Sequence, residues 1–315
     1  QFEGNPDSVN SFNNDYNVKF LPETQHLKLN FIKKKVYFET KDNFKNKNNE
    51  EKLYQGKYFN TINHIDLFSD ETLLINGNKG EIYKWNIDIN KILSDENLDF
   101  NKINSNINEI WILDILVHNK EIFISFVNEE EKCKHFNISK SIFDLNNLAF
   151  ENFFKSNDCS TKKVFGGIIQ PYSFNNHDGI LVTTSEVEIN KPNMNPQKDE
   201  STFGKILFFD LENKNKIVFS KGHRNPQGLF VDIEEDLILS TEHGPQGGDE
   251  INKIEYNKNY GWPISSYGER YSEYGPLRKK INTVNPDLKY KKSHIDYNFQ
   301  EPIFSFLVGI GISEI

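Results

Sequence analysis

Residues 222–263 of the chain read GHRNPQGLFVDIEEDLILSTEHGPQGGDEINKIEYNKNYGWP, which combines two polar, glycine-rich turns with short apolar strands. The first turn, residues 223–228, presents a cation and two amide side chains on a backbone that Pro226 restricts. The second turn, residues 242–250, presents carboxylates and backbone carbonyls where glycine permits close approach. Such turns at strand ends favour a site for an anionic, metal-bound ligand over a plain scaffold.

The strand pattern around this block predicts an all-β fold. From about residue 58 onward, short strands recur roughly every ten residues with turn residues between them, and 89–95 is the main stretch that looks helical. A turn followed by an alternating strand recurs at 80–86, 204–210 and 250–256. A unit of about 40–50 residues that holds four strands is typical of a β-propeller blade. A β-sandwich with accidental self-similarity is the alternative.

Net charge and the distribution of apolar residues limit which partners and which domain organisation are expected. The net charge is −9, from 37 basic and 46 acidic residues, which disfavours nucleic acid because neutralising phosphates requires a clustered basic surface. No apolar run approaches the roughly 20 residues that a membrane span needs. Residues 1–50 are polar and are expected to form a poorly ordered or partial first-blade segment, followed by a propeller over 51–315. Because the chain starts without Met and stops within an apolar, strand-like run (304–308), we expect a fragment that lacks the last part of the propeller.

Cys133 and Cys159 are the two cysteines of the chain. They flank a segment that is expected to form a strand, a turn and another short strand, so a disulfide between them would close one hairpin-like unit. Such a bond fits an oxidising compartment, and two reduced, unrelated thiols are the alternative. No histidine lies at zinc-ligand spacing from either cysteine, which argues against a zinc site.

The motifs GHRNPQGL, TEHGPQGGDEIN and NYGWP, in this order and spacing, closely resemble the soluble quinoprotein glucose dehydrogenase and aldose sugar dehydrogenase family, also called glucose/sorbosone dehydrogenases. A weaker similarity extends from about residue 165 to the end of the chain, and residues 1–160 match only in general strand pattern. Members of this family are six-bladed β-propellers that bind pyrroloquinoline quinone (PQQ) and calcium in a central depression. The resemblance therefore implies a six-bladed propeller, truncated here at the C-terminus.

The resemblance also implies residue roles. Arg224 would polarise the quinone oxygens, as a fixed positive charge does for oxygen that gains electron density, and Asn225 would donate a hydrogen bond to the cofactor. The carbonyls of Gly244 and Pro245 match the positions that hold the cofactor-bound calcium. Hard Ca²⁺ favours such oxygen ligands.

The resemblance implies further roles less directly, and some of them have alternatives. Glu250 and the carbonyl of Tyr260 match a second, structural calcium site, with a plain turn and strand start as the alternative. Arg224 has its own alternative, in which it pairs with Glu242 or Asp249. His223 and His243 are expected to orient the turns, and Trp262 to pack between blades.

One segment departs from the family pattern. Family enzymes use as general base a histidine that precedes a Gly-Gly-Arg strand, but here Val164 and Ile168 stand where the histidine and the arginine would be. A valine cannot accept a proton, and a base typically contributes about 10²–10⁴-fold in rate. His177 lies on an expected hairpin turn, far from the cofactor along its strand, so Glu186 or Glu188 is the substitute base to consider.

These observations predict a PQQ- and calcium-dependent aldose dehydrogenase-like protein, which transfers hydride from a sugar hydroxyl carbon to the quinone. The alternative is a non-catalytic β-propeller that binds a ligand or a protein and has lost the catalytic histidine. The expected location is periplasmic or secreted, and the expected partner is a small sugar. The electron acceptor cannot be named from the sequence, and a lactonase-type hydrolase has no recognisable metal-ligand carboxylates here.

Overall fold

The computed structural model describes most of the chain beyond residue 63. The described residues are 64–69, 72–76, 80–86, 101–107, 110–161, 165–186, 194–245, 247–268, 290–306, 308–313 and 315. Their regular structure is strand apart from short 3₁₀ turns, and they include no helix with the length and apolar character needed to cross a bilayer. The predicted segment 1–50, the predicted helix at 89–95, Val164 and Glu188 lie outside the described residues.

The described strands form four sheets, each built mainly from consecutive antiparallel hairpins. The first sheet holds β1 (His64–Ser69), β2 (Thr72–Asn76), β3 (Ile82–Asn86), β4 (Asn101–Ser105) and β8 (Asn147–Leu148), and the second holds β5 (Trp111–His118), β6 (Glu121–Glu130), β7 (Cys133–Ile142) and β9 (Glu151–Lys155). The third holds β10 (Gly166–Phe174), β11 (His177–Thr184), β12 (Lys205–Asp210), β13 (Lys216–Lys221) and β17 (Lys258–Asn259), and the fourth holds β14 (Pro226–Asp232), β15 (Leu237–Glu242), β16 (Asp249–Lys253) and β18 (Phe304–Phe306).

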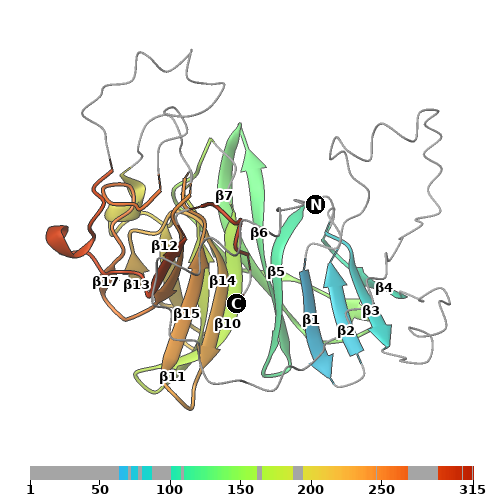
Figure 1. Ribbon diagram of the computed structural model, residues 1–315. Helices are drawn as coiled ribbons and strands as arrows, with labels where there is room; N and C mark the ends of the chain where they lie inside the picture. The colour runs from blue at the N-terminus through green and yellow to red at the C-terminus, as the bar shows by residue number, and fades with distance from the viewer. Residues whose placement is uncertain are drawn as a thin grey trace, which may run out of the picture. The chain divides into compact units, whose positions relative to one another are not determined.

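The first strand of each sheet lies beside the first strand of the next one. Strand β1 contacts β5, β5 contacts β10, and β10 contacts β14 (Figure 1). Successive hairpin-built sheets of four or five strands, each beginning beside the first strand of the previous sheet, resemble the four-stranded blades of propellers. The all-β prediction is confirmed, whereas six blades and a truncated last part stay predictions, because the described residues form four sheets that do not close on themselves.

Strand positions follow the sequence pattern closely. The strand predicted at 205–210 is β12 itself, and the hairpin predicted at 175–179 is the turn between β10 and β11. Asn175 and Asn176 adopt φ of 52° and 64° there, the left-handed backbone that a two-residue hairpin turn requires. The strand predicted at 250–256 is shorter, since β16 ends at Lys253.

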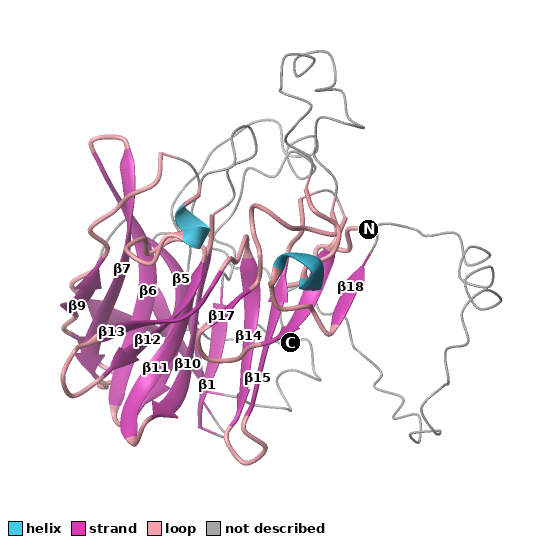
Figure 2. Ribbon diagram, turned by 90° about the vertical axis from the view of Figure 1, so that its left-hand side faces the viewer, coloured by secondary structure: helices cyan, strands magenta, loops and turns pink. Residues whose placement is uncertain are grey.

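Apolar layers join successive sheets. Strand β12 contributes to two of them through its alternation: Ile206 and Phe208 face the fourth sheet, while Leu207 and Phe209 face the second. Side chains of a strand point alternately to opposite faces, so the third sheet is buried on both sides, and its strands lie side by side in Figure 2. The predicted alternation of this segment is thus confirmed, with a neighbouring sheet on each face.

A disulfide links Cys133, the first residue of β7, to Cys159, which follows β9. Their Cα atoms lie 5.5 Å apart. The bond closes the β7–β9 part of the second sheet, as the sequence predicted, and the described residues contain no free cysteine.

Candidate cofactor site

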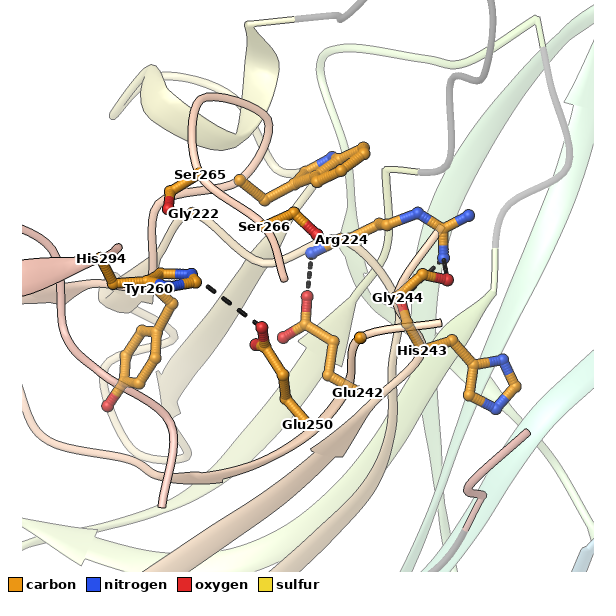
Figure 3. Close-up of a pocket in the computed structure, with 12 residues that line it drawn as sticks. Gly222, Arg224, Glu242, His243, Gly244, Glu250, Tyr260, Ser265, Ser266 and His294 are labelled. Carbon is orange, nitrogen blue, oxygen red and sulfur yellow. Dashed lines mark hydrogen bonds and ion pairs between the residues drawn. The ribbon is translucent and has the colours of Figure 1, made fainter. Parts of the chain in front are cut away.

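The two glycine-rich turns meet at one end of the fourth sheet. Strands β14 and β15 pair there with Pro226 opposite Glu242, so the turn that precedes β14 and the turn that follows β15 emerge next to each other. They border a pocket (Figure 3). Its lining residues are Gly222, Arg224, Glu242, His243, Gly244, Gly248, Glu250, Tyr260, Trp262, Ser265, Ser266 and His294.

Glu242 organises the first turn. Its carboxylate accepts hydrogen bonds from the backbone N–H groups of Arg224 and Asn225, and it lies 3.0 Å from Nδ1 of His223. The other ring nitrogen of His223 lies 2.8 Å from Oγ of Ser220. Since Glu242 is 5% exposed and His223 is fully buried, this network fixes the backbone of the turn, which is the orienting role predicted for His223.

Arg224 projects from that turn into the pocket wall. Its Nη1 donates hydrogen bonds of 2.7 Å to the carbonyls of His243 and Gly244, and its guanidinium carbon lies 5.4 Å from the ring centre of Trp262. The predicted alternative, a side-chain pair with Glu242 or Asp249, therefore differs from the observed contacts, in which Glu242 binds the backbone of Arg224. Trp262 lines the pocket instead of serving only as packing between blades.

Asp249 holds the second turn. One carboxylate oxygen accepts from the backbone N–H of Gly244 at 2.9 Å. The other accepts from the N–H groups of Ile310 and Gly311 at 2.9 and 2.8 Å. The turn beside Arg224 is thereby tied to the segment after β18, 61 residues further along the chain.

Glu250 places a second carboxylate in the pocket. Burial raises the pKa of Glu250 well above its usual range, and the nearby Glu242 carboxylate raises it further. Nε2 of His294 lies 4.0 Å from Oε1 of Glu250, and burial lowers the pKa of His294. A carboxylate that is costly to ionise in this position would be stabilised by a bound cation.

Calcium prefers carboxylate and carbonyl oxygens as ligands. Asn252 donates to Glu250 through Nδ2, and its fully buried Oδ1 has no hydrogen-bond partner in the described part of the chain. Tyr260 and Glu250 line the same pocket, whereas Asn252 is not among its lining residues. The described residues contain no group of three or more His, Cys, Asp or Glu side chains that could hold a metal, and the Gly244 carbonyl accepts from Arg224.

The segment that departs from the family pattern lies next to the first turn. A Cβ on Gly166, whose φ is 75°, would lie 3.1 Å from the carbonyl oxygen of Pro226, and the Thr183 hydroxyl donates to that same oxygen at 3.3 Å. Ile168 packs against the apolar layer between the third and fourth sheets. Val164 itself lies outside the described residues, two positions before Gly166.

The candidate substitute base is buried close to Arg224. The backbone N–H of Glu186 donates to the Arg224 carbonyl at 2.7 Å, and the Glu186 carbonyl accepts from the indole of Trp262 at 3.1 Å. The Glu186 side chain is 4% exposed and is not among the residues that line the pocket. His177 begins β11 at the end opposite Glu186, as the sequence predicted.

A layer of amide hydrogen bonds lies behind the pocket. Gln197, in the 3₁₀ turn η1 (Asn195–Gln197), bonds to Asn259 in β17 and to the carbonyl of Trp262. Gly222 fits against this layer with φ of 78°, and a Cβ there would overlap Oδ1 of Asn259. No motif signals these contacts, because the paired amides lie 62 residues apart.

Lys205 anchors the same turn from β12. Its Nζ donates to the carbonyls of Asn195 and Phe203 at 2.7 and 2.9 Å, and the residue is fully buried. Burial lowers the pKa of Lys205 to about 7. Above pH 7 the folded protein therefore favours a neutral amine at a position where the unfolded chain would still carry a positive charge.

We expect this lysine to make stability depend on pH. Between the folded pKa near 7 and the unfolded value of 10.5, the unfolded chain binds a proton that the folded protein does not, so stability rises with pH by up to about 1.4 kcal/mol per unit. Lys205→Met removes this contribution. Chemical denaturation at pH 7.5 and 8.5 should show a gain about 1 kcal/mol larger in the parent than in the variant. Lys102→Met, at an exposed position, is the control and should show the same gain in unfolding free energy as the parent protein. An equal gain in the parent and in Lys205→Met contradicts the expectation.

The structure brings most of the predicted site residues together. Arg224, Gly244, Glu250 and Tyr260 line one pocket, while Asn225 and Pro245 belong to the same two turns without lining it. Glu242, from the second predicted turn, also lines the pocket, and the imidazole of His294 is a lining residue that the motifs do not indicate. His294 gives no signal in the sequence, because it lies 44 residues beyond Glu250 and outside every motif.

Residues 59–300 match the family described as glucose/sorbosone dehydrogenase. The chain belongs to the glucose/sorbosone dehydrogenase family. The resemblance inferred from the motifs in 222–263 is thereby confirmed, and sugar oxidoreductase chemistry is the activity of named relatives.

Two characterised relatives share local sequence with this member of the family. The chain is 46% identical over 57 residues to aldose sugar dehydrogenase YliI of Escherichia coli (strain K12), covering 18% of the chain and 15% of that protein. It is 37% identical over 100 residues to quinoprotein glucose dehydrogenase B of Acinetobacter calcoaceticus, covering 26% of the chain and 21% of that protein. The matched stretches span well under two thirds of either relative.

Solved structures of glucose/sorbosone dehydrogenase type share the fold. A glucose dehydrogenase crystal structure superposes with a TM-score of 0.59 at 22% identity, covering 81% of this chain and 77% of that one. The apo-form of the soluble aldose sugar dehydrogenase from Escherichia coli gives 0.59 at 20% identity, covering 79% and 72%. The PQQ-bound aldose sugar dehydrogenase from Streptomyces coelicolor gives 0.52 at 19% identity, covering 66% and 64%.

Proposed function

We propose that this member of the family is a PQQ- and calcium-dependent aldose dehydrogenase, in which hydride passes from a sugar hydroxyl carbon to the quinone. The observation that carries the proposal is the placement of Arg224: a buried cation beside the carbonyl of Gly244, in a pocket that also holds two carboxylates. Fixed charges of both signs at one place would suit an anionic cofactor that binds together with a cation.

Arg224 and Asn225 would hold the cofactor. The Arg224 guanidinium is held by the carbonyls of His243 and Gly244, and its remaining N–H groups would meet the quinone oxygens. Calcium binding to the Gly244 carbonyl would require Nη1 to give up that hydrogen bond. PQQ, when bound, supplies the carbon that accepts hydride. The turn that presents Asn225 is held by Glu242 and His243, which keeps its amide close to the arginine.

Calcium would be held by oxygen donors of the second turn. The carbonyls of Gly244 and Pro245 are assigned to a calcium that contacts the cofactor, and Glu250 with the Tyr260 carbonyl to a structural calcium. Support for the second assignment comes from the raised pKa of Glu250, since a carboxylate buried near another carboxylate is stabilised when a divalent cation neutralises it.

A second candidate function is favoured by one specific observation. Val164 and Ile168 replace the histidine and arginine of the family pattern, so the protein would bind a ligand in the pocket without oxidising it. The backbone N–H of Glu186 donates to the Arg224 carbonyl, and Glu188 follows two residues later in the sequence. If the protein is an enzyme, one of these two glutamates would have to serve as the base.

The proposed setting is periplasmic or secreted. The disulfide between Cys133 and Cys159 supports this proposal, because such bonds persist in oxidising compartments. A small sugar is the proposed substrate, and its electrons would pass from the cofactor to an external acceptor.

Reconstitution tests the proposal directly. PQQ and Ca²⁺ are added to the protein, and we expect a shift of the cofactor absorbance and a rise in melting temperature, because ligand binding to the folded state stabilises it. Dye reduction with a panel of aldoses then separates an enzyme from a binder. Absence of both the absorbance shift and the stabilisation would refute the cofactor-binding function.

A further inference from the structure

We propose that Gln197 and Asn259 are positioning residues, which set the indole of Trp262 and, through it, the guanidinium of Arg224. The proposal deepens the proposed function and rests on it for the identity of the ligand. The hydrogen bonds and distances that define the amide pair are independent of any cofactor.

The two amides bond to each other reciprocally. Nδ2 of Asn259 donates to Oε1 of Gln197 at 2.7 Å, and Nε2 of Gln197 donates to Oδ1 of Asn259 at 3.2 Å. Each amide then reaches the Gly261–Trp262 backbone: Gln197 donates to the Trp262 carbonyl at 2.6 Å, and Asn259 accepts from the Gly261 N–H at 3.0 Å. The pair therefore uses both of its ends to hold the peptide that carries Trp262.

Trp262 is held at every polar atom it has. Its backbone N–H donates to the Gly222 carbonyl at 2.9 Å, its carbonyl accepts from Gln197, and its indole N–H donates to the Glu186 carbonyl at 3.1 Å. The residue is 5% exposed. An indole fixed at these points presents its face in one orientation.

That face meets the guanidinium of Arg224. The guanidinium carbon lies 5.4 Å from the ring centre, within the range of a cation–π contact. On the other side, Nη1 bonds to the carbonyls of His243 and Gly244. Arg224 thus contacts both the ring of Trp262 and two carbonyls, so a shift of the ring would change one of the contacts that hold its guanidinium.

Gly222 couples the amide pair to the turn that carries Arg224. Its N–H donates to the Pro196 carbonyl next to Gln197 at 3.0 Å, and a side chain on Gly222 would overlap Oδ1 of Asn259. Loosening the pair therefore moves both the ring and the backbone that precedes Arg224. A planar fork binds oxygen acceptors well only when its orientation is kept, so affinity for the quinone should fall although no ligand contact is removed.

The test uses neutral variants, Gln197→Met and Asn259→Leu, so that added charge does not itself repel an anionic ligand. Asn152→Leu, at an exposed position of β9, is the matched control. The first readout needs no cofactor: the side-chain Nε–Hε signal of Arg224 in ¹⁵N-arginine-labelled protein, which the Trp262 ring current shifts. The chain has Arg224, Arg270 and Arg278 as its arginines, so Arg224→Lys assigns the signal.

We expect the Arg224 signal to move in Gln197→Met and in Asn259→Leu and to stay unchanged in Asn152→Leu. In the same two amide variants, PQQ affinity should fall about tenfold, the size of a typical coupling between contacting residues. If Asn259→Leu fails to fold, the test rests on Gln197→Met alone, because this variant keeps Asn259 as the acceptor for the Gly261 N–H. An unmoved Arg224 signal in a folded variant overturns the proposal. If the parent protein binds no PQQ, the proposed function fails, while the resonance still decides whether the amide pair positions Arg224.

Discussion

Replacing Arg224 with alanine is expected to weaken PQQ binding about 100-fold, measured by titration of the protein with the cofactor in the presence of Ca²⁺. Arg224 is 6% exposed and lines the pocket, so it meets the ligand where water cannot replace it. Hydrogen bonds from a charged donor contribute about 1.5–3 kcal/mol, and a guanidinium can form two parallel bonds to acceptor oxygens. Loss of one such bidentate contact accounts for the expected factor.

Arg224→Lys separates charge from geometry. A lysine keeps the positive charge but offers no planar fork, so we expect an affinity between those of the parent and the alanine variant. The carboxylate of Glu242 bonds to the backbone of residue 224 and not to its side chain, so the turn retains its main support in both variants. An unchanged affinity in Arg224→Ala would contradict the assignment of the pocket to the cofactor.

The fold could be predicted from the sequence wherever strands alternate and turns carry their own chemistry. Strand β12 matches its predicted bounds because Ile206, Leu207, Phe208 and Phe209 alternate between two apolar layers. The turn at Asn175 and Asn176 was recognisable because asparagine tolerates left-handed backbone. The number of blades could not be predicted in this way, since it depends on long-range closure and not on local pattern.

The residues of the candidate site likewise fall into two groups, those that belong to contiguous motifs and those whose partners lie far away in the sequence. Arg224 and Glu250 were found because both belong to contiguous motifs. The roles of Trp262 and His294 could not be read locally: the first depends on Gln197, 65 residues away, and the second on Glu250, 44 residues away. Buried polar contacts of this kind are made between separate segments, so no spacing rule along one strand reports them.

Val164→His is the second change for which we expect a large effect. In the presence of PQQ and Ca²⁺, aldose turnover should rise by about 10²–10⁴-fold, the usual contribution of a general base. The position is two residues before Gly166, which lies against the Pro226 carbonyl beside Arg224. The added rate should increase with pH through roughly 6.5, because a histidine accepts a proton only when it is neutral.

A glutamine at the same position provides the control for size and polarity. Val164→Gln cannot act as a base at these pH values, so its turnover should stay at the level of the parent protein. A rise in both variants would show that volume or polarity at residue 164 matters and that proton transfer does not. If neither variant gains activity while PQQ affinity is unchanged, the base lies elsewhere or the protein is a binder. Glu186→Gln then distinguishes these two cases, because it lowers a residual turnover only if the Glu186 carboxylate accepts the proton.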